Sequence, residues 1–479
     1  MKIKCGIEIH QQLLTHKLFC PCSSGMHEKP QLEIVRRLRP VPGELGDVDV
    51  AAQYEFLRNR VFAYKHYPNE SCLVELDEEP PHQLNPEALE TAVMIALMLN
   101  CDIPDEIHIM RKIVIDGSDT TGFQRTALIG MNGWIKTSFG KVGIKSVCLE
   151  EESAQILGRK AGKPELVTYG LNRFGIPLVE IGTQPDITNF EEARETAEKL
   201  GMILRSTQRV KTGLGTIRQD LNISIPGGVR VEIKGVQSLS LIPKVLEFEA
   251  KRQESLLKAG EKPRPEVRKA NPDGTTEFLR PLPGAARLYP ETDCPPVRID
   301  RSWLDALKLK LPELLDEKIK RWVEGYKLSW ELASQLVRSD KAGLFEYLIQ
   351  WADPKLVANV LVNVLKGLKR EGVGIEKLEA RHFRFVFEAL REERIAKEGI
   401  PELLKKFAEN PQARIEELVS ETLGPEEVKR LVKKILKEKP ELRELRNPFQ
   451  AYMGLVMKQV RGRAPGSLIA KILKEELSE

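Results

Sequence analysis

The chain has 479 residues, of which 41% are hydrophobic, 30% charged and 6% aromatic. This length suits roughly two to four domains, and the composition excludes a single small binding module as well as a disordered or fibrous chain. Because 74 Lys and Arg stand against 70 Asp and Glu, the net charge is only +4, so a polyanionic partner needs a local basic patch.

The cysteine pattern and the hydropathy indicate the compartment. Seven cysteines, an odd number scattered through a long chain, are typical of free thiols in a reducing environment. No apolar run reaches the roughly 18 residues of a membrane span, and the first residues lack the apolar core of a signal peptide. The sequence therefore predicts a cytoplasmic protein with no membrane partner.

The first predicted element is a strand over residues 3–12, in which hydropathy alternates with a period of two. One face carries Ile3, Cys5, Ile7 and Ile9, and the other carries Glu8, His10 and Gln12. A carboxylate and an imidazole are thus expected to point the same way.

A Cys-Pro-Cys motif at Cys20 and Cys22 supplies half of a possible zinc site. No second cysteine pair follows within about forty residues, and His27 is the one nearby candidate for a third ligand. The spacing therefore argues against zinc and favours ordinary thiols.

Residues 111–126 predict a strand that leads into a loop rich in Gly, Ser and Thr. Asp116 and Ser118 stand at the start of this loop, which could present backbone N–H groups and hydroxyls to a phosphate. A P-loop is excluded, because Ile144 occupies the position of the second glycine in the nearest match.

Two acidic segments follow. Glu150, Glu151 and Glu152 are consecutive, and a divalent cation or an arginine would relieve their repulsion, although a solvated turn explains them equally well. Glu180 lies inside an apolar strand at residues 177–181, where the alternative to a reactive role is a buried carboxylate paired with Arg173.

Residues 217–225 and 229–234 predict an antiparallel hairpin around a Pro-Gly-Gly turn. Its polar face carries Arg218, Asp220 and Asn222 on the first strand and Lys234 on the second. A polar face turned to water is the ordinary explanation for one strand. Short Asp, Asn, Ser and His side chains beside Arg, repeated on several strands, favour recognition of a metal, phosphate or carboxylate instead.

The pattern changes near residue 300 from strands to Lys/Glu/Leu-rich helices, which predicts an α+β protein with a β-rich antiparallel part at residues 1–298. The Pro-rich stretch at 280–296 is predicted to be a loop and linker. Helical domains are expected at 299–409, with an apolar stripe over 356–368, and at 410–479.

A basic helix is predicted at residues 425–439. Its cations and those of the C-terminal tail either form a solvated surface or contact a nucleic-acid backbone. They are Lys429, Arg430, Lys433, Lys434, Arg461 and Arg463.

Several motifs, in this order, resemble the B/E family of tRNA-dependent amidotransferases (GatB/GatE). They are Gly6-Ile7-Glu8-Ile9-His10-Gln11-Gln12, Leu18-Phe19-Cys20, Asp116-Gly117-Ser118, Gly122-Phe123-Gln124-Arg125-Thr126, Leu149-Glu150-Glu151, Asn172-Arg173-Phe174-Gly175-Ile176-Pro177 and Val231-Glu232-Ile233-Lys234. Within the family, the Arg280-Pro281-Leu282-Pro283-Gly284 motif looks like the archaeal E type. The Cys-x-x-Cys pair of the B type has no counterpart between Pro40 and Gly46, which again argues against zinc.

The resemblance implies a cradle-shaped β-rich domain, a helical domain and a small YqeY-like tail domain that binds tRNA. It implies a ligase that uses ATP and Mg²⁺ to phosphorylate the side chain of Glu on misacylated Glu-tRNA(Gln), after which ammonia displaces phosphate. Since no glutaminase site is recognisable, it also implies an asparaginase-like D subunit as the ammonia source.

Carried over by position, the resemblance implies a catalytic centre formed by Glu8, His10, Glu150, Glu151 and Glu180. Within it, His10, Glu151 and Glu180 would bind Mg²⁺, with His10 alternatively orienting a ligand. Asp116, Ser118, Arg173, Arg218 and Lys234 would position ATP or substrate.

One departure concerns the aspartyl-tRNA-synthetase-like domain that the E type normally carries after the helix ending near Leu257. Here residues 258–265 run directly on to Glu266. Two alternatives stay open: a B-type chain that works with A and C subunits, and a noncatalytic tRNA-binding scaffold.

Overall fold

The computed structural model describes residues 2–478 except 44, 285–287, 340, 393, 415–417, 419–422, 445–446, 461–463 and 465. The chain divides into two compact units, Met1–Leu314 and Leu315–Glu479. The first is built on β-sheets and the second on helices, so the predicted α+β class is confirmed.

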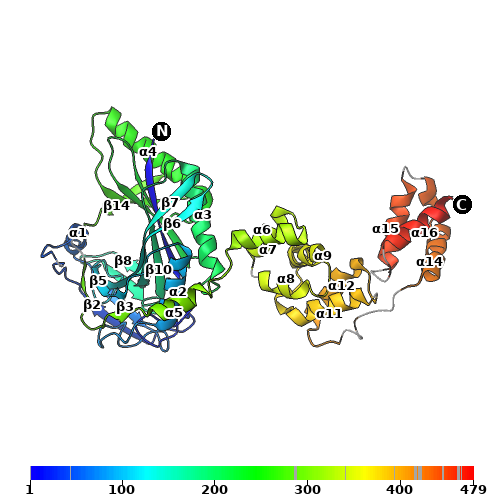
Figure 1. The fold of residues 1–479 in the computed structure, drawn as a ribbon, viewed down its shortest axis with the longest axis horizontal. Helices are drawn as coiled ribbons and strands as arrows, with labels where there is room; N and C mark the ends of the chain where they lie inside the picture. The colour runs from blue at the N-terminus through cyan, green and yellow to red at the C-terminus, as the bar shows by residue number, and fades with distance from the viewer. Residues whose placement is uncertain are drawn as a thin grey trace. The chain divides into compact units, whose positions relative to one another are not determined.

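A ten-stranded sheet forms the centre of the first unit (Figure 1). All neighbouring strands in it are antiparallel except β12 and β13, which are parallel. The strands, in order across the sheet, are β14 (Thr276–Pro281), β13 (Glu266–Ala270), β12 (Val231–Lys234), β11 (Ile217–Ser224), β1 (Lys4–Gln12), β10 (Pro177–Thr183), β7 (Gly140–Glu151), β6 (Phe123–Thr137), β5 (Ile109–Ile113) and β15 (Leu288–Pro290).

One face of this sheet is covered by α2 (Pro86–Met98), α3 (Phe190–Ser206) and α4 (Ile242–Lys258). The alternation predicted for the first strand explains this, because the side chains of Ile7 and Ile9 point into the same apolar core as those of these helices. The opposite face is therefore left to the polar side chains of the same strands.

Helix α4 also returns the chain from β12 to the parallel strand β13. The C-terminal end of the helix is capped by a hydrogen bond from Gly260 N to Leu257 O, and Gly260 adopts a positive φ of 77°. A short connection then reaches Glu266, the first residue of β13.

A second, four-stranded sheet has the order β2 (Leu32–Arg36), β3 (Val61–His66), β9 (Leu166–Gly170) and β8 (Gln155–Lys160). Its core contains Phe62, Tyr64 and Tyr169, with the two tyrosine rings stacked at 5.9 Å. The short helix α1 (Val50–Leu57) precedes β3.

The prediction of a loop and linker at residues 280–296 is partly wrong: residues 282–284 and 291–296 form no helix or strand, but β14 ends at Pro281 and β15 spans Leu288–Pro290. Strand β15 pairs with β5 at the edge of the large sheet, and β16 (Val297–Arg298) pairs with β4 (Glu106–Ile107). Proline is tolerated in an edge strand, because its missing N–H need not be paired. The first unit continues to Leu314, past the predicted boundary at residue 298, since Leu304 and Leu307 of α5 (Arg301–Lys308) pack into its core.

The second unit consists of helices. They are α6 (Leu315–Tyr326), α7 (Trp330–Val337), α8 (Ala342–Leu348), α9 (Pro354–Asn359), α10 (Leu365–Arg370), α11 (Ala380–Arg391), α12 (Ile400–Glu409), α14 (Pro425–Glu438), α15 (Pro448–Val460) and α16 (Gly466–Ser478). The predicted apolar stripe spans α9, one π-helical turn at Val360–Val364 and α10.

Two apolar clusters lie in the second unit, one within residues 319–407 and one within 428–473. The finer division of this unit at residue 409 stays a prediction. Throughout the described part of the chain, every helix is too short or too polar to cross a bilayer.

Candidate active site

The polar faces predicted for separate strands form one continuous face of the large sheet. Antiparallel pairing places His10 of β1 between Glu180 of β10 and Arg218 of β11, and places Glu8 opposite Asp220. Directly opposed residues of neighbouring strands project from the same side of a sheet. The register therefore gathers side chains that are up to about two hundred residues apart in sequence.

Glu8, His10 and Glu180 form a tight group at the centre of this face. His10 Nε2 lies 3.3 Å from Glu8 Oε1 and 3.3 Å from Glu180 Oε2. The three side chains are partly accessible, with exposed fractions of 25%, 14% and 18%. Two carboxylates and an imidazole thus converge on one point that a ligand can reach.

The close packing of these groups shifts their pKa values. Burial, together with the charge of Glu180, raises the pKa of Glu8 to about 7. Burial alone would lower the pKa of His10, but the hydrogen bond and charge of Glu180 outweigh it and raise the pKa to about 9. For Glu180, Lys112 and His10 overcome the effect of burial and hold its pKa well below the usual range.

Lys112 of β5 joins the group to Glu150, and sequence reasoning missed it. Its Nζ lies 2.6 Å from Glu150 Oε1 and 3.4 Å from Glu180 Oε2. Glu150 also accepts hydrogen bonds from Gln124 and Thr126 of β6. No local pattern marks Lys112, because three strands separate β5 from β1 in the sheet.

Glu151 does not join Glu8, His10 and Glu180. Its neighbour on β6, Arg125, donates to it from the backbone N–H at 3.0 Å and from the guanidinium at 3.3 and 3.4 Å. Because side chains alternate along β7, Glu151 faces away from Glu150.

Glu152 binds Arg218, whose Nη2 lies 2.7 and 2.8 Å from the two carboxylate oxygens. Gln12 of β1 also donates to this carboxylate. The three consecutive glutamates, Glu150 to Glu152, are only 1–2% exposed, which rules out a solvated turn.

Lys234 of β12 lies between two carboxylates, with Nζ 2.8 Å from both Asp220 Oδ2 and Glu232 Oε1. Burial lowers the pKa of Lys234, but these two carboxylates outweigh it and raise the pKa above its ordinary value. Positively and negatively charged side chains therefore alternate where β11 and β12 contribute to this face, with Lys234 between Asp220 and Glu232.

The predicted phosphate loop is fixed by the smaller sheet. Tyr64 Oη donates to Gly117 O, and Asp116 Oδ1 accepts from both the backbone N–H and the hydroxyl of Ser118. Gly117 has a φ of 96°, and a Cβ there would lie 2.2 Å from the Phe62 ring, so only glycine fits.

Arg173 has a different place from the one that its pairing with Glu180 would require. Its Nε donates to Ser153 O at 2.7 Å and its Nη2 to Ala154 O at 3.1 Å. The alternative of an Arg173–Glu180 ion pair is therefore wrong. Through these two hydrogen bonds, Arg173 holds the backbone that follows β7 in place.

A cavity of about 610 Å³ opens on this face. Its lining includes predicted residues together with others that sequence reasoning did not select: Glu8, His10, Lys112, Asp116, Ser118, Gln124, Glu152, Ser153, Glu180, Arg218, Asp220, Arg230, Glu232, Lys234 and Arg280. Arg280 Nη1 lies 3.9 Å from Asp116 Oδ2, and its Nε has no hydrogen-bond partner among the described residues.

Three of the predicted tRNA-binding cations of α14 lie near carboxylates. Lys429 and Lys433 both lie near Glu476 of α16, at 3.6 and 3.4 Å, and Lys434 lies 3.8 Å from Glu438. Arg430 is exposed on the same helix. Two further predicted residues, Arg461 and Arg463, lie outside the described residues.

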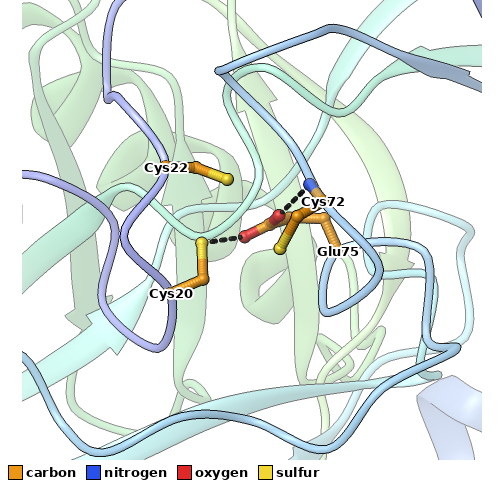
Figure 2. Close-up of side chains that lie close together, drawn as sticks. All are labelled: Cys20, Cys22, Cys72 and Glu75. Atoms are coloured by element: carbon orange, nitrogen blue, oxygen red, sulfur yellow. Dashed lines mark hydrogen bonds between the residues drawn. The ribbon is translucent and has the colours of Figure 1, made fainter.

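A second group of metal-ligating side chains lies in the loops after β1 and β3 (Figure 2). It brings Cys72 and Glu75 to the Cys20-Pro21-Cys22 motif, whereas His27 is exposed and is not a member. The prediction against zinc depended on the lack of a second cysteine pair close in sequence. That criterion does not consider a single cysteine such as Cys72, which lies fifty positions after Cys22.

Comparison with known proteins gives two family matches. Residues 3–305 match the model described as the GatB/GatE catalytic domain, and residues 343–477 match the one described as the GatB domain. The first match spans the whole sheet and its polar face.

Curated relatives resemble the chain over its full length. It is 38% identical to the E subunit of glutamyl-tRNA(Gln) amidotransferase from Methanocaldococcus jannaschii, covering 100% of this chain and 98% of the relative. The identity is 38% to the E subunit from Archaeoglobus fulgidus, over 99% and 98%, and 36% to that from Pyrococcus abyssi, over 95% and 93%. The first match runs over 624 positions, so the relative contains a long stretch without a counterpart in these 479 residues.

Proposed function

The chain belongs to the GatB/GatE family, and from this premise we propose that it is the component of a Glu-tRNA(Gln) amidotransferase that carries out transamidation. The γ-phosphoryl group of ATP passes to the side-chain carboxylate of Glu attached to tRNA(Gln). Ammonia then attacks the acyl phosphate carbon, phosphate leaves, and Gln-tRNA(Gln) is formed. The chain is thus a ligase, and we place it with its tRNA substrate in the cytoplasm.

The observation that carries this proposal is the alternation of carboxylates and cations around one cavity. A free carboxylate resists attack by ammonia because oxide is a poor leaving group, whereas phosphate leaves readily. Transfer of the phosphoryl group needs positive charge near the oxygens that become more negative. Lys112, Arg218 and Lys234 supply this charge in the cavity.

Glu8 and Glu180 fit a hard divalent cation, because carboxylate oxygens are the ligands that Mg²⁺ prefers. His10 lies between them and is the less usual ligand, so we assign it to orient the two carboxylates. Mg²⁺ held by Glu8 and Glu180 would supply positive charge to the transferring phosphoryl group. Glu151, which the resemblance implied as a ligand, is held by Arg125 and is left out of this assignment.

ATP is positioned by groups around the rim. Asp116 and Ser118 line the cavity, and so do Arg218 and Lys234. We add Arg280 to the predicted set, because its Nε has no hydrogen-bond partner in the described part of the chain while its side chain lines the cavity. Arg173 does not line the cavity itself but donates a hydrogen bond to the backbone of Ser153, which does.

Ammonia must be supplied by another protein, in keeping with the naming of the relatives as one lettered component of an amidotransferase. We propose an asparaginase-like D subunit that hydrolyses glutamine and passes ammonia to this cavity. Pairing with A and C subunits is the alternative, and copurification with the D subunit or with A and C decides between them.

The test is amidation of Glu-tRNA(Gln) by this chain with ATP, Mg²⁺ and ammonium chloride, which removes the need for a glutaminase. We expect Glu180→Gln to lower the rate by at least about a hundredfold, because a group that stabilises the transition state is lost. Glu277→Gln is the matched control, since Glu277 is an exposed carboxylate on β14 that pairs with Lys269.

A noncatalytic scaffold predicts a different result. In that case the folded wild-type chain binds tRNA but forms no Gln-tRNA(Gln), with or without the D subunit. Equal rates for the wild type and Glu180→Gln would likewise contradict the assigned centre.

A further inference from the structure

Asp119 has a buried carboxyl group beside the cavity that the proposed chemistry does not use. Its side chain is fully buried, and it is absent from the cavity lining, which includes its neighbours Asp116, Ser118 and Ser153. Its Oδ2 lies 2.9 Å from Ser118 Oγ and 3.5 Å from Ser153 Oγ, and its Oδ1 has no hydrogen-bond partner among the described residues. A buried carboxylate needs hydrogen bonds or a cation for its charge, so these surroundings favour the neutral form.

The hydroxyl of Ser118 indicates that a proton is held in this group. Ser118 Oγ lies 2.6 Å from Asp116 Oδ1 and 2.9 Å from Asp119 Oδ2. A serine hydroxyl has one hydrogen, so it can donate fully to only one of the two carboxyl groups. If both were ionised, the other contact would bring lone pairs of two oxygen atoms together with no hydrogen between them. One of the two carboxyl groups therefore carries a proton.

The surroundings assign that proton to Asp119. The charge of Asp116 is stabilised, because its Oδ1 also accepts the backbone N–H of Ser118 at 2.9 Å and its Oδ2 lies 3.9 Å from Arg280 Nη1. The carboxyl group of Asp119, by contrast, meets only hydroxyl groups within the described part of the chain. Burial, reinforced by the charge of Asp116, raises the pKa of Asp119 well above its usual range.

Other ionisable side chains act on Asp119 from the elements packed around this loop. They are Glu151 of β7, Lys112 of β5, Tyr64 of β3, Tyr169 of β9 and Arg173. The two cations have closer partners, since Lys112 Nζ lies 2.6 Å from Glu150 Oε1 and Arg173 donates to Ser153 O and Ala154 O. The charge of Asp119 would therefore lack an ion pair.

We propose that Asp119 is a neutral carboxylic acid in the folded protein at neutral pH and acts as a positioning residue for Asp116 and Ser118. Its Oδ2 donates a proton to Ser118 Oγ in a hydrogen bond, and the Ser118 hydroxyl in turn donates to Asp116 Oδ1. These two hydrogen bonds fix two side chains that line the cavity. The loop also presents one negative charge to ATP where it would otherwise present two. The inference rests on the proposed ATP site, which Asp116 and Ser118 help to form.

Infrared difference spectroscopy detects the proton without an activity assay. The spectrum of the wild type minus that of Asp119→Asn, taken at neutral pH, should contain the carbonyl band of a protonated carboxylic acid. Asp305→Asn is the control, because it changes an exposed aspartate of α5, and its difference spectrum should contain carboxylate bands instead. Carboxylate bands for Asp119 as well would overturn the proposal.

The positioning role is tested by amidation with ammonium chloride at varied ATP. The amide of Asn can donate to Ser118 as the acid does, so Asp119→Asn should keep KM for ATP within about twofold of the wild type. Asp119→Leu is similar in size but has no donor, so it should raise this KM at least about fivefold. Its kcat should change less than about twofold, since Asp119 does not line the cavity.

A double variant tests the path of the hydrogen bonds. In a Ser118→Ala background, Asp119→Leu should raise KM no further, because Asp119 acts on Asp116 through the Ser118 hydroxyl. The proposal is overturned if Asp119→Asn raises KM as much as folded Asp119→Leu does, or if Asp119→Leu keeps the wild-type KM. If Asp119→Leu fails to fold, the infrared spectra still decide whether Asp119 is protonated. A wild type that forms no Gln-tRNA(Gln) would contradict the proposed function alone, since the infrared result does not depend on amidation.

Discussion

Arg125 of β6 holds Glu151 of β7 with both its backbone and its side chain. The backbone N–H donates at 3.0 Å and the guanidinium at 3.3 Å, while Arg125 Nε donates to Glu291 at 2.8 Å. All three side chains are buried. Arg125 therefore joins two strands of the sheet to the segment after β15, and one guanidinium serves two carboxylates.

Removal of this guanidinium should destabilise the first unit. We expect Arg125→Met to lower the free energy of unfolding by about 3–5 kcal/mol, because Glu151 is left buried without its cation and Glu291 keeps only its ion pair with Arg111. Denaturant unfolding followed by circular dichroism measures the change. Arg194→Met, which breaks an exposed ion pair with Glu191, is the control and should cost less than about 1 kcal/mol. Equal losses in the two variants would contradict the role of Arg125.

The dependence of amidation on Mg²⁺ distinguishes the candidate ligands. Glu8→Gln should raise the Mg²⁺ concentration for half-maximal rate at least about tenfold, because a carboxylate next to the cation is lost. Glu151→Gln should leave this concentration unchanged while lowering the melting temperature. A raised Mg²⁺ requirement in Glu151→Gln would instead return that residue to the cation site.

Asp119 should make stability depend on pH. Burial and the nearby charge of Asp116 raise its pKa well above the usual range, and its Oδ1 has no hydrogen-bond partner among the described residues. As pH rises through the unfolded-state pKa of about 3.9, the unfolded chain loses this proton while the folded chain keeps it, so stability falls until the raised folded pKa is passed.

Asp119→Asn removes that loss. The melting temperature of the variant relative to wild type should therefore increase with pH over the same window and then level off. Asp305→Asn, at an exposed aspartate of α5, should show a difference that does not change with pH. A constant difference for Asp119→Asn as well would mean that Asp119 titrates normally.

The basic helix α14 should contribute to tRNA affinity. Changing Lys429, Lys433 and Lys434 to Gln should weaken binding and reduce the slope of log K against log salt by roughly 0.7–0.9 for each phosphate that is no longer neutralised. Glu476→Gln should have the opposite effect, since this carboxylate lies near two of the lysines. Lys251→Gln with Lys258→Gln on α4 is the control, and an unchanged slope in the α14 variant would favour a merely solvated helix.

Strand alternation predicted much of the chemistry-bearing face. Glu8 with His10, and Arg218 with Asp220, were paired correctly because the period of two is a property of each strand alone. The neighbours across strands depend on register, which no local pattern gives. This is why the partners of Glu180 are His10 and Lys112 and not the sequence-near Arg173.

The same limit explains why the sequence did not indicate that Cys72 lies beside Cys20 and Cys22. A search for metal sites by spacing finds ligands that share one turn, and Cys20 and Cys22 meet that condition. Cys72 and Glu75 reach them only after α1 and β3 have been formed and the chain has returned. The strand at residues 288–290 was not predicted for a related reason: the sequence shows Pro290, but only the finished sheet places it in an edge strand.

The connection between α4 and β13 has a consequence for how the family can vary. The helix is already closed at Gly260, and β13 takes its register from β12 and β14, so neither end depends on the residues between them. The entropy cost of lengthening such a connection grows only with the logarithm of its length, about 0.6 kcal/mol for each doubling. A whole domain can therefore be gained or lost at this junction without disturbing the sheet.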